Sequence, residues 1–170
     1  MRVLKIVIAV GCLSTGLGAQ GTGRKPIEGA WRVTEIVVTG ASTSSVATPQ
    51  PGLMIFTSGY YSIMYVGGSQ ARKPFITEDP SSEERLAAFD SFSANTGTYE
   101  LAGTTLTIRP IVARNPSFMS GGFDKYQFRI EGITLTLINT SSDLNLRKGD
   151  RVVPSSAPVS ETRLKLVRVE

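Results

Sequence analysis

Short apolar runs that alternate with polar residues constrain the fold of this chain more than any other feature. From residue 25 on, runs of five to ten residues rich in Val, Ile, Thr, Tyr and Phe are separated by Gly, Ser, Asn and Pro. This pattern is typical of β-strands bounded by turns. The runs predict eight strands, at residues 30–39, 52–57, 60–66, 97–101, 104–113, 122–131, 133–138 and 161–169.

The connections between these runs indicate antiparallel hairpins. Gly59, Gly103 and Gly132 lie in three tight connections, where glycine supplies the positive φ of a hairpin turn. Eight is also the number of strands at which a barrel leaves room for side chains or one small ligand. We therefore expect an all-β fold, an eight-stranded antiparallel up-and-down barrel. The longer connections 40–50 and 139–160 lack periodicity and are expected as rims or partial lids.

The alternation also predicts an apolar inner face. Tyr126, Phe128 and Ile130 share one face of the run at 122–131, and the opposite face carries Lys, Gln, Arg and Glu. The same reasoning applied to the other runs gives the candidates for a ligand cavity. They are Val33, Glu35, Tyr61, Ile63, Tyr65, Tyr99, Leu106, Ile108, Tyr126, Phe128 and Leu135.

One segment, residues 81–94, has the pattern of a short helix. Ser81 and Glu84 have the spacing of a capping box, and apolar residues follow at intervals of three, through Phe89 and Phe92. We expect this helix to pack across the barrel or over one mouth. Its Phe residues are expected in the core rather than against a ligand.

The first nineteen residues have the pattern of an export signal. Arg2 and Lys5 precede a short apolar run that ends at Leu13, and small residues follow as far as Ala19. The run is far shorter than the roughly 20 residues that span a bilayer, so we expect no transmembrane segment. Cleavage near Ala19 would release a secreted or periplasmic bacterial protein.

This signal predicts three parts of the chain: a signal peptide at 1–19, a short linker at 20–26 and a barrel domain at 27–170. Two alternatives stay open for the first part. The residues before Cys12 resemble a bacterial lipobox, which would give a lipid anchor at that cysteine. The apolar run would otherwise be a first buried strand.

The composition limits the chemistry that the chain can perform. It has no His and one Cys, which excludes histidine-based triads, Cys/His zinc sites and an intramolecular disulfide. We expect no metal and no cofactor. Basic residues occur in scattered pairs, and loss of the signal peptide would lower the net charge from +4 to +2. We therefore expect no nucleic-acid partner.

Several motifs resemble a known family in their order and spacing. The sequence Gly29-Ala30-Trp31 opens the first strand, and Gly-x-Trp at that position is the signature of the lipocalins. Over residues 27–169 the chain resembles the bacterial and fungal lipocalin-like domain family. The segments that carry this resemblance are Gly29 to Val33, Pro51 to Thr57, Gly59 to Ser62, Gly97 to Leu101, Tyr126 to Leu137 and Leu166 to Val169.

The resemblance implies roles for particular residues. Gly29, Trp31 and Arg168 would form a structural signature, in which Trp31 plugs the closed end of the barrel and Arg168 lies across its indole. The chain departs from the family at residues 108–110, Ile-Arg-Pro, where many relatives carry His. An activity that depends on this His is not expected here. Pro110 also removes a ladder N–H, which predicts a bulge or a barrel edge.

Glu35 is the sequence's candidate for acid–base chemistry. Counting by two from Trp31 through Val33 places Glu35 on the inner face, where a low dielectric would raise the pKa of its carboxyl group. A strand irregularity that turns Glu35 outward, or an ion pair with an Arg, is the alternative that we favour over catalysis. Arg109 and Arg114 are candidates to pair with such carboxylates or with an anionic ligand.

These observations lead to three functional hypotheses. In the first, an exported lipocalin-like barrel binds a small, mostly hydrophobic ligand. In the second, the barrel is a cyclase or isomerase for polyketide- or lipid-like substrates, with Glu35 as its acid–base residue. In the third, a filled barrel without ligand serves as an envelope or interaction protein. Because the chain lacks His, we favour binding over catalysis.

Overall fold

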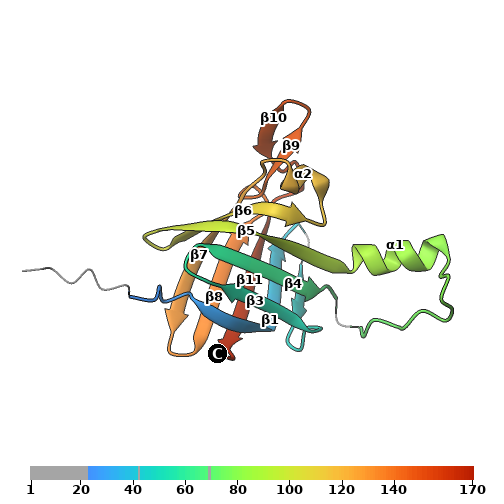
Figure 1. Ribbon diagram of the computed structural model, residues 1–170, viewed down its shortest axis with the longest axis horizontal. Helices are drawn as coiled ribbons and strands as arrows, with labels where there is room; N and C mark the ends of the chain where they lie inside the picture. Colours follow the sequence, from blue (N-terminus) through green and yellow to red (C-terminus); the bar gives the residue numbers. More distant parts are fainter. Residues whose placement is uncertain (1–22, 42, 69) are drawn as a thin grey trace, which may run out of the picture.

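A computed structural model describes residues 23–41, 43–68 and 70–170, and its fold is built mainly from strands (Figure 1). The strands are β1 (Gly29–Gly40), β2 (Ser44–Val46), β3 (Gly52–Phe56), β4 (Tyr60–Val66), β5 (Phe92–Ala102), β6 (Thr105–Ala113), β7 (Asp124–Glu131), β8 (Thr134–Thr140), β9 (Asn145–Lys148), β10 (Arg151–Pro154) and β11 (Ser160–Arg168). The helices are α1 (Ser82–Asp90) and α2 (Pro116–Met119).

Eight of these strands form a closed antiparallel barrel. Their order is β11-β8-β7-β6-β5-β4-β3-β1, and β11 also pairs with β1, which closes the sheet. Each strand lies beside its neighbour in the meander, so the predicted up-and-down barrel is confirmed. The short β2 adds to β1 outside this ring, and β9 and β10 form a separate hairpin that the sequence pattern did not predict.

One end of the barrel is filled by large side chains. Trp31 is fully buried there, and its Nε1 donates a hydrogen bond to the carbonyl oxygen of Ile27 over 2.7 Å. The rings of Phe56 and Tyr99 meet edge to face with centroids 5.4 Å apart, and the Tyr99 hydroxyl donates to the carbonyl oxygen of Thr57 over 2.7 Å. These contacts make this the closed end of the barrel.

Arg168 covers Trp31 at the closed end. Its guanidinium lies 4.1 Å from the centre of the Trp31 ring and donates to the carbonyl oxygens of Glu28 and Pro26, at 2.5 and 2.7 Å. The stacking that the resemblance implied is therefore present. Gly29 has a φ of 135°, and a Cβ there would lie 2.5 Å from an Arg168 nitrogen, so only glycine fits beneath this arginine.

A β-bulge in β1 reverses the inward and outward positions. The register against β11 shifts between Val33 and Glu35, so Thr34 has no paired residue in β11. Glu35 then lies opposite Lys165, which is exposed on the outer face of the barrel, and Ile36 takes the inward position. The inward position that counting by two gives Glu35 is wrong, and the favoured alternative, a strand irregularity that turns it outward, is present, because the extra residue moves every later side chain to the other face.

A second bulge lies where β5 faces β6. Gly97 pairs with Pro110 and the next pair skips Ile111, so the bulge predicted from Pro110 is present. Ile111 and Val112 are both exposed, whereas Ala113 turns inward. A Cβ at position 97 would lie 2.0 Å from a backbone oxygen of β6, so glycine is required at this close approach.

The predicted helix forms, but it does not pack on the barrel. Ser81 and Glu84 make both hydrogen bonds of the capping box. The helix ends at Asp90 because Phe92 is already paired with β4. No residue of α1 is buried, and Phe89 is 51% exposed. Figure 1 shows α1 projecting away from the barrel, so the expected core packing and the expected position over a mouth are wrong.

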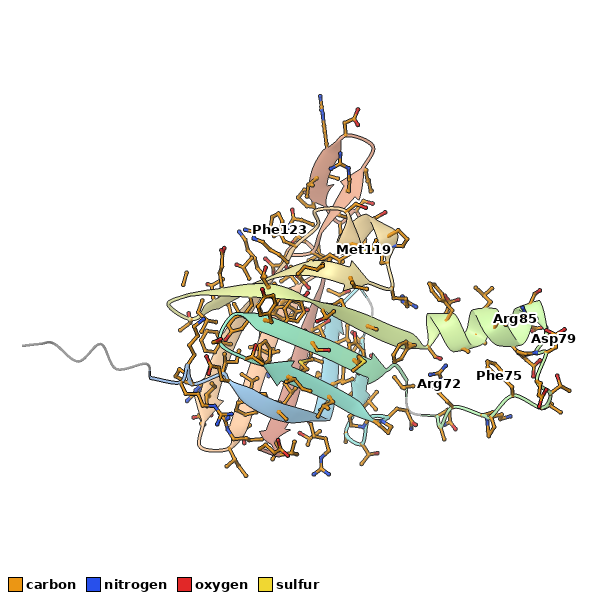
Figure 2. The ribbon with its side chains drawn as sticks, viewed as in Figure 1. Arg72, Phe75, Asp79, Arg85, Met119 and Phe123 are labelled. Atoms are coloured by element: carbon orange, nitrogen blue, oxygen red, sulfur yellow. The ribbon has the colours of Figure 1, made fainter. Side chains whose placement is uncertain are left out.

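At the outer end of this projection, Arg85 of α1 pairs with Asp79, far from the barrel (Figure 2).

The predicted signal peptide, its cleavage site and Cys12 lie outside the described residues. In the part of the chain that the structure describes, no helix is long and apolar enough to cross a membrane.

Candidate binding cavity

The end of the barrel opposite Trp31 is hollow. A cavity of about 420 Å³ lies there, a volume typical of sites for small molecules. Its apolar lining consists of Ile36, Val38, Met54, Ile63, Ala94, Ala113, Phe118, Leu144, Leu146 and Leu164. Its polar lining includes Tyr65, Ser93, Asn95, Asp124, Tyr126, Asn139 and Thr162.

This end is hollow because small side chains take its inward positions. Ser93, Ala113 and Thr162 face the cavity, whereas Trp31 and Phe56 fill the closed end. The bulge in β6 contributes directly, since it turns an alanine inward and the two larger residues before it outward. The cavity is thus a consequence of local sequence.

A cap covers part of the opening. Asn115 is the N-cap of the helix α2, and its side chain accepts a hydrogen bond from the backbone N–H of Ser117. The helix places Phe118 in the cavity wall. Phe123 and Asn145 exchange two backbone hydrogen bonds, of 3.1 and 2.8 Å, which tie the β6–β7 connection to β9. Figure 2 shows Met119 and Phe123 at this end of the molecule, below the β9–β10 hairpin.

Asp124 is the one charged residue that is buried among those described. It is 5% exposed and lies in the cavity wall at the start of β7. Its carboxylate accepts hydrogen bonds from Asn139 Nδ2, at 3.3 and 3.2 Å, from the backbone N–H of Lys125 and from the Tyr126 hydroxyl. Burial outweighs these hydrogen bonds and raises the pKa of Asp124 to about 6.

Two buried side-chain polar atoms among the described residues have no hydrogen-bond partner. They are the Tyr61 hydroxyl and the Asn95 Oδ1. Asn95 lines the cavity, and Tyr61 lies close enough for the charge of Asp124 to add to the effect of burial, which raises the pKa of Tyr61. An unpaired buried polar group costs roughly 1–3 kcal/mol. Of the two atoms, Asn95 Oδ1 belongs to the cavity lining, where a ligand would satisfy it.

No described cation pairs with Asp124. The ion pairs in the described ranges are all on the surface. Arg114, at the mouth, donates to the carbonyl oxygen of Phe89 over 2.5 Å and lies 4.7 Å from the centre of its ring. Arg109 lies 5.2 Å from the ring centre of Phe123. Both arginines thus make other contacts, and neither pairs with a cavity carboxylate, which was one of their candidate roles.

The structure divides the predicted cavity residues into two groups. Ile63, Tyr65 and Tyr126 line the cavity, and Tyr61 lies near its floor. The others belong to the packed core or pack against it, and Glu35 lies on the outer face. The core group consists of Val33, Tyr99, Leu106, Ile108, Phe128 and Leu135.

Sequence reasoning missed the three polar residues Asp124, Asn95 and Asn139. Asp124 had a usable signal, because it shares the alternating inner face of Tyr126 and Phe128 within a predicted strand. Asn95 lay outside the predicted elements, between the helix expected at 81–94 and the strand expected at 97–101. Its inward position follows the alternation of β5, in which Gly97 and Tyr99 are buried on the same face.

Comparison of the sequence with known protein families finds no family model that matches, and comparison with curated proteins finds no matching relative. The resemblance to lipocalin-like domains therefore stays a prediction. The fold and the cavity define a structural class, a closed eight-stranded antiparallel barrel with a filled end and a hollow, partly capped end.

Proposed function

We propose that this protein binds a small, mostly apolar molecule in the hollow end of its barrel. The observation that carries the proposal is the cavity of about 420 Å³, whose wall is mainly aliphatic and aromatic. Burying an apolar ligand against this wall supplies affinity at ~25 cal/mol per Å² of apolar surface. The polar groups around Asp124 would fix the ligand's orientation. The hollow end also argues against a filled barrel without ligand.

Ala113 and Val112 offer a matched test of this proposal, because they are adjacent but lie on opposite faces of the barrel wall. Ala113→Phe is expected to weaken binding of a neutral apolar probe, N-phenyl-1-naphthylamine, by about tenfold or more, since the new ring fills the cavity. Val112→Phe adds the same ring outside and is expected to change the affinity less than about twofold. Fluorescence titration measures both. Equal affinities in the two variants would contradict binding in the cavity.

A second function, a cyclase or isomerase acting on polyketide- or lipid-like substrates, is supported by Asp124. A carboxyl group with a pKa of about 6, in a cavity and beside a tyrosine, has the properties of a general acid–base residue. Asp124 would then take the role that the sequence suggested for Glu35. Exchange of the α-protons of a small 1,3-diketone in D₂O tests it: catalysed exchange lost in Asp124→Asn supports it, and exchange unaffected by the variant excludes it.

We further propose that the protein is exported, on the pattern of its first nineteen residues. The mass of the protein isolated from the periplasm or medium checks this. Cleavage near Ala19 is expected to give a chain that begins at about residue 20. A chain that begins at a lipid-modified Cys12 would support the anchor instead. A periplasmic or secreted chain that retains Met1 would contradict both.

A further inference from the structure

The floor of the cavity is negatively charged and rich in hydrogen-bond acceptors. Asp124 supplies a carboxylate and Asn95 supplies an unpaired amide oxygen. Asp143 adds a second negative charge close enough to raise the pKa of Asp124 further. The Asp143 carboxylate itself accepts hydrogen bonds from the backbone N–H and the hydroxyl of Thr140, both at 2.7 Å.

The donors that contact Asp124 are already used. Asn139, the Tyr126 hydroxyl and the Lys125 backbone N–H all donate to Asp124. Arg114, the cationic residue in the cavity wall, donates to the carbonyl of Phe89 instead. A molecule that reaches Asp124 therefore meets a buried carboxylate that no described cation pairs with, and the unpaired Asn95 Oδ1 lies in the same cavity lining. Its complement is a group that donates hydrogen bonds and carries a positive charge.

We propose that the ligand carries a protonated primary or secondary amine at one end of a small apolar body. The ammonium donates to the carboxylate of Asp124, while the apolar body lies against Ile63, Phe118 and Leu146. This inference rests on the proposed binding function and specifies its ligand class. It explains why a buried carboxylate without a cation is present, since the ligand supplies the missing charge.

Binding of an amine through Asp124 is expected to depend on pH. The titratable groups coupled to Asp124 are Tyr126 on β7, Tyr61 on β4 and Asp143 after β8; Tyr65 and Arg114 also line the cavity. Burial raises the pKa of both Tyr61 and Tyr126, so these two phenols stay neutral. As the pH falls through about 6, Asp124 takes up a proton and loses the charge that attracts the amine.

Three ligands of the same size separate charge from apolar burial: 3-phenylpropylamine, 3-phenylpropanol and 3-phenylpropanoate. By calorimetry at pH 7.5 the amine is expected to bind at least about tenfold tighter than the alcohol, and the carboxylate weakest. Between pH 7.5 and pH 5 the affinity for the amine is expected to fall about tenfold, while that for the alcohol stays constant. Asp124→Asn is expected to make amine and alcohol equal. The control Asp150→Asn, in an exposed turn, keeps the difference.

The outcomes distinguish this inference from the proposed function. An alcohol or carboxylate that binds as tightly as the amine, with the naphthyl probe still bound in the cavity, would overturn the amine and leave the binding function intact. An amine preference that persists in Asp124→Asn would also overturn the inference. If neither the three ligands nor the naphthyl probe bind, both proposals fail.

Discussion

Replacing Trp31 by Ala is expected to lower the free energy of unfolding by about 4 kcal/mol, because it removes a large, fully buried side chain from the closed end of the barrel. The substitution also removes the hydrogen bond to Ile27 and the ring on which Arg168 lies. The guanidinium of Arg168 is also held by the backbone carbonyls of Glu28 and Pro26. The closed end of the barrel therefore cannot collapse freely into the space that the indole leaves.

Urea unfolding followed by circular dichroism measures this effect, since Trp31 is the protein's one tryptophan and its fluorescence is lost with it. Tyr60→Ala is the control, because Tyr60 is 61% exposed on β4 and its loss is expected to cost less than about 1 kcal/mol. A similar loss of stability in both variants would show that Trp31 is not a central part of the core.

Replacing Asp124 by Asn is expected to stabilise the unliganded protein at pH 7.5, by up to about 3 kcal/mol. The pKa of Asp124 in the folded state, about 6, exceeds the ordinary value of 3.8. Between these values the folded protein binds more protons than the unfolded chain, so the folded state loses stability as the pH rises. The penalty is complete above pH 6 and absent below the ordinary value. An asparagine remains neutral and avoids it.

Unfolding free energies measured from pH 4.5 to pH 7.5 check this prediction. The difference between wild type and Asp124→Asn is expected to grow with pH, whereas Asp150→Asn follows the wild type throughout. A variant that is less stable than the wild type at pH 7.5 would show that the ionised carboxylate stabilises the fold. The expected result would instead mark Asp124 as a residue that costs stability, as is typical of functional sites.

The fold was predictable because its signals are local. Alternation within each run and a glycine at each tight turn define hairpins, and hairpins in series close into a barrel once the last strand pairs with the first. The helix start at Ser81 was equally visible, since a capping box is a local pattern. Its end was not, because the pairing of Phe92 with β4 decides it.

The candidate site was only partly predictable, because bulges decide which side chains enter it. Counting by two predicts that the Glu35 side chain faces the barrel interior. The bulge at Thr34 instead turns it to the outer face. Pro110 predicted the other bulge. It did not predict that this bulge would turn Ala113 toward the cavity. Asn139, which donates to Asp124, comes from another strand, β8, and its position depends on register, which no single run of sequence contains.

Native mass spectrometry of the protein purified from the organism that makes it tests the central claim most directly. The wild type and Val112→Phe are expected to carry an additional small mass, which is released near pH 5 and contains a basic nitrogen. Ala113→Phe is expected to lack it, because its cavity is filled. Absence of any additional mass in the wild type, together with no thermal shift across a panel of apolar amines and alcohols, would contradict the account. So would an additional mass that Ala113→Phe retains in full.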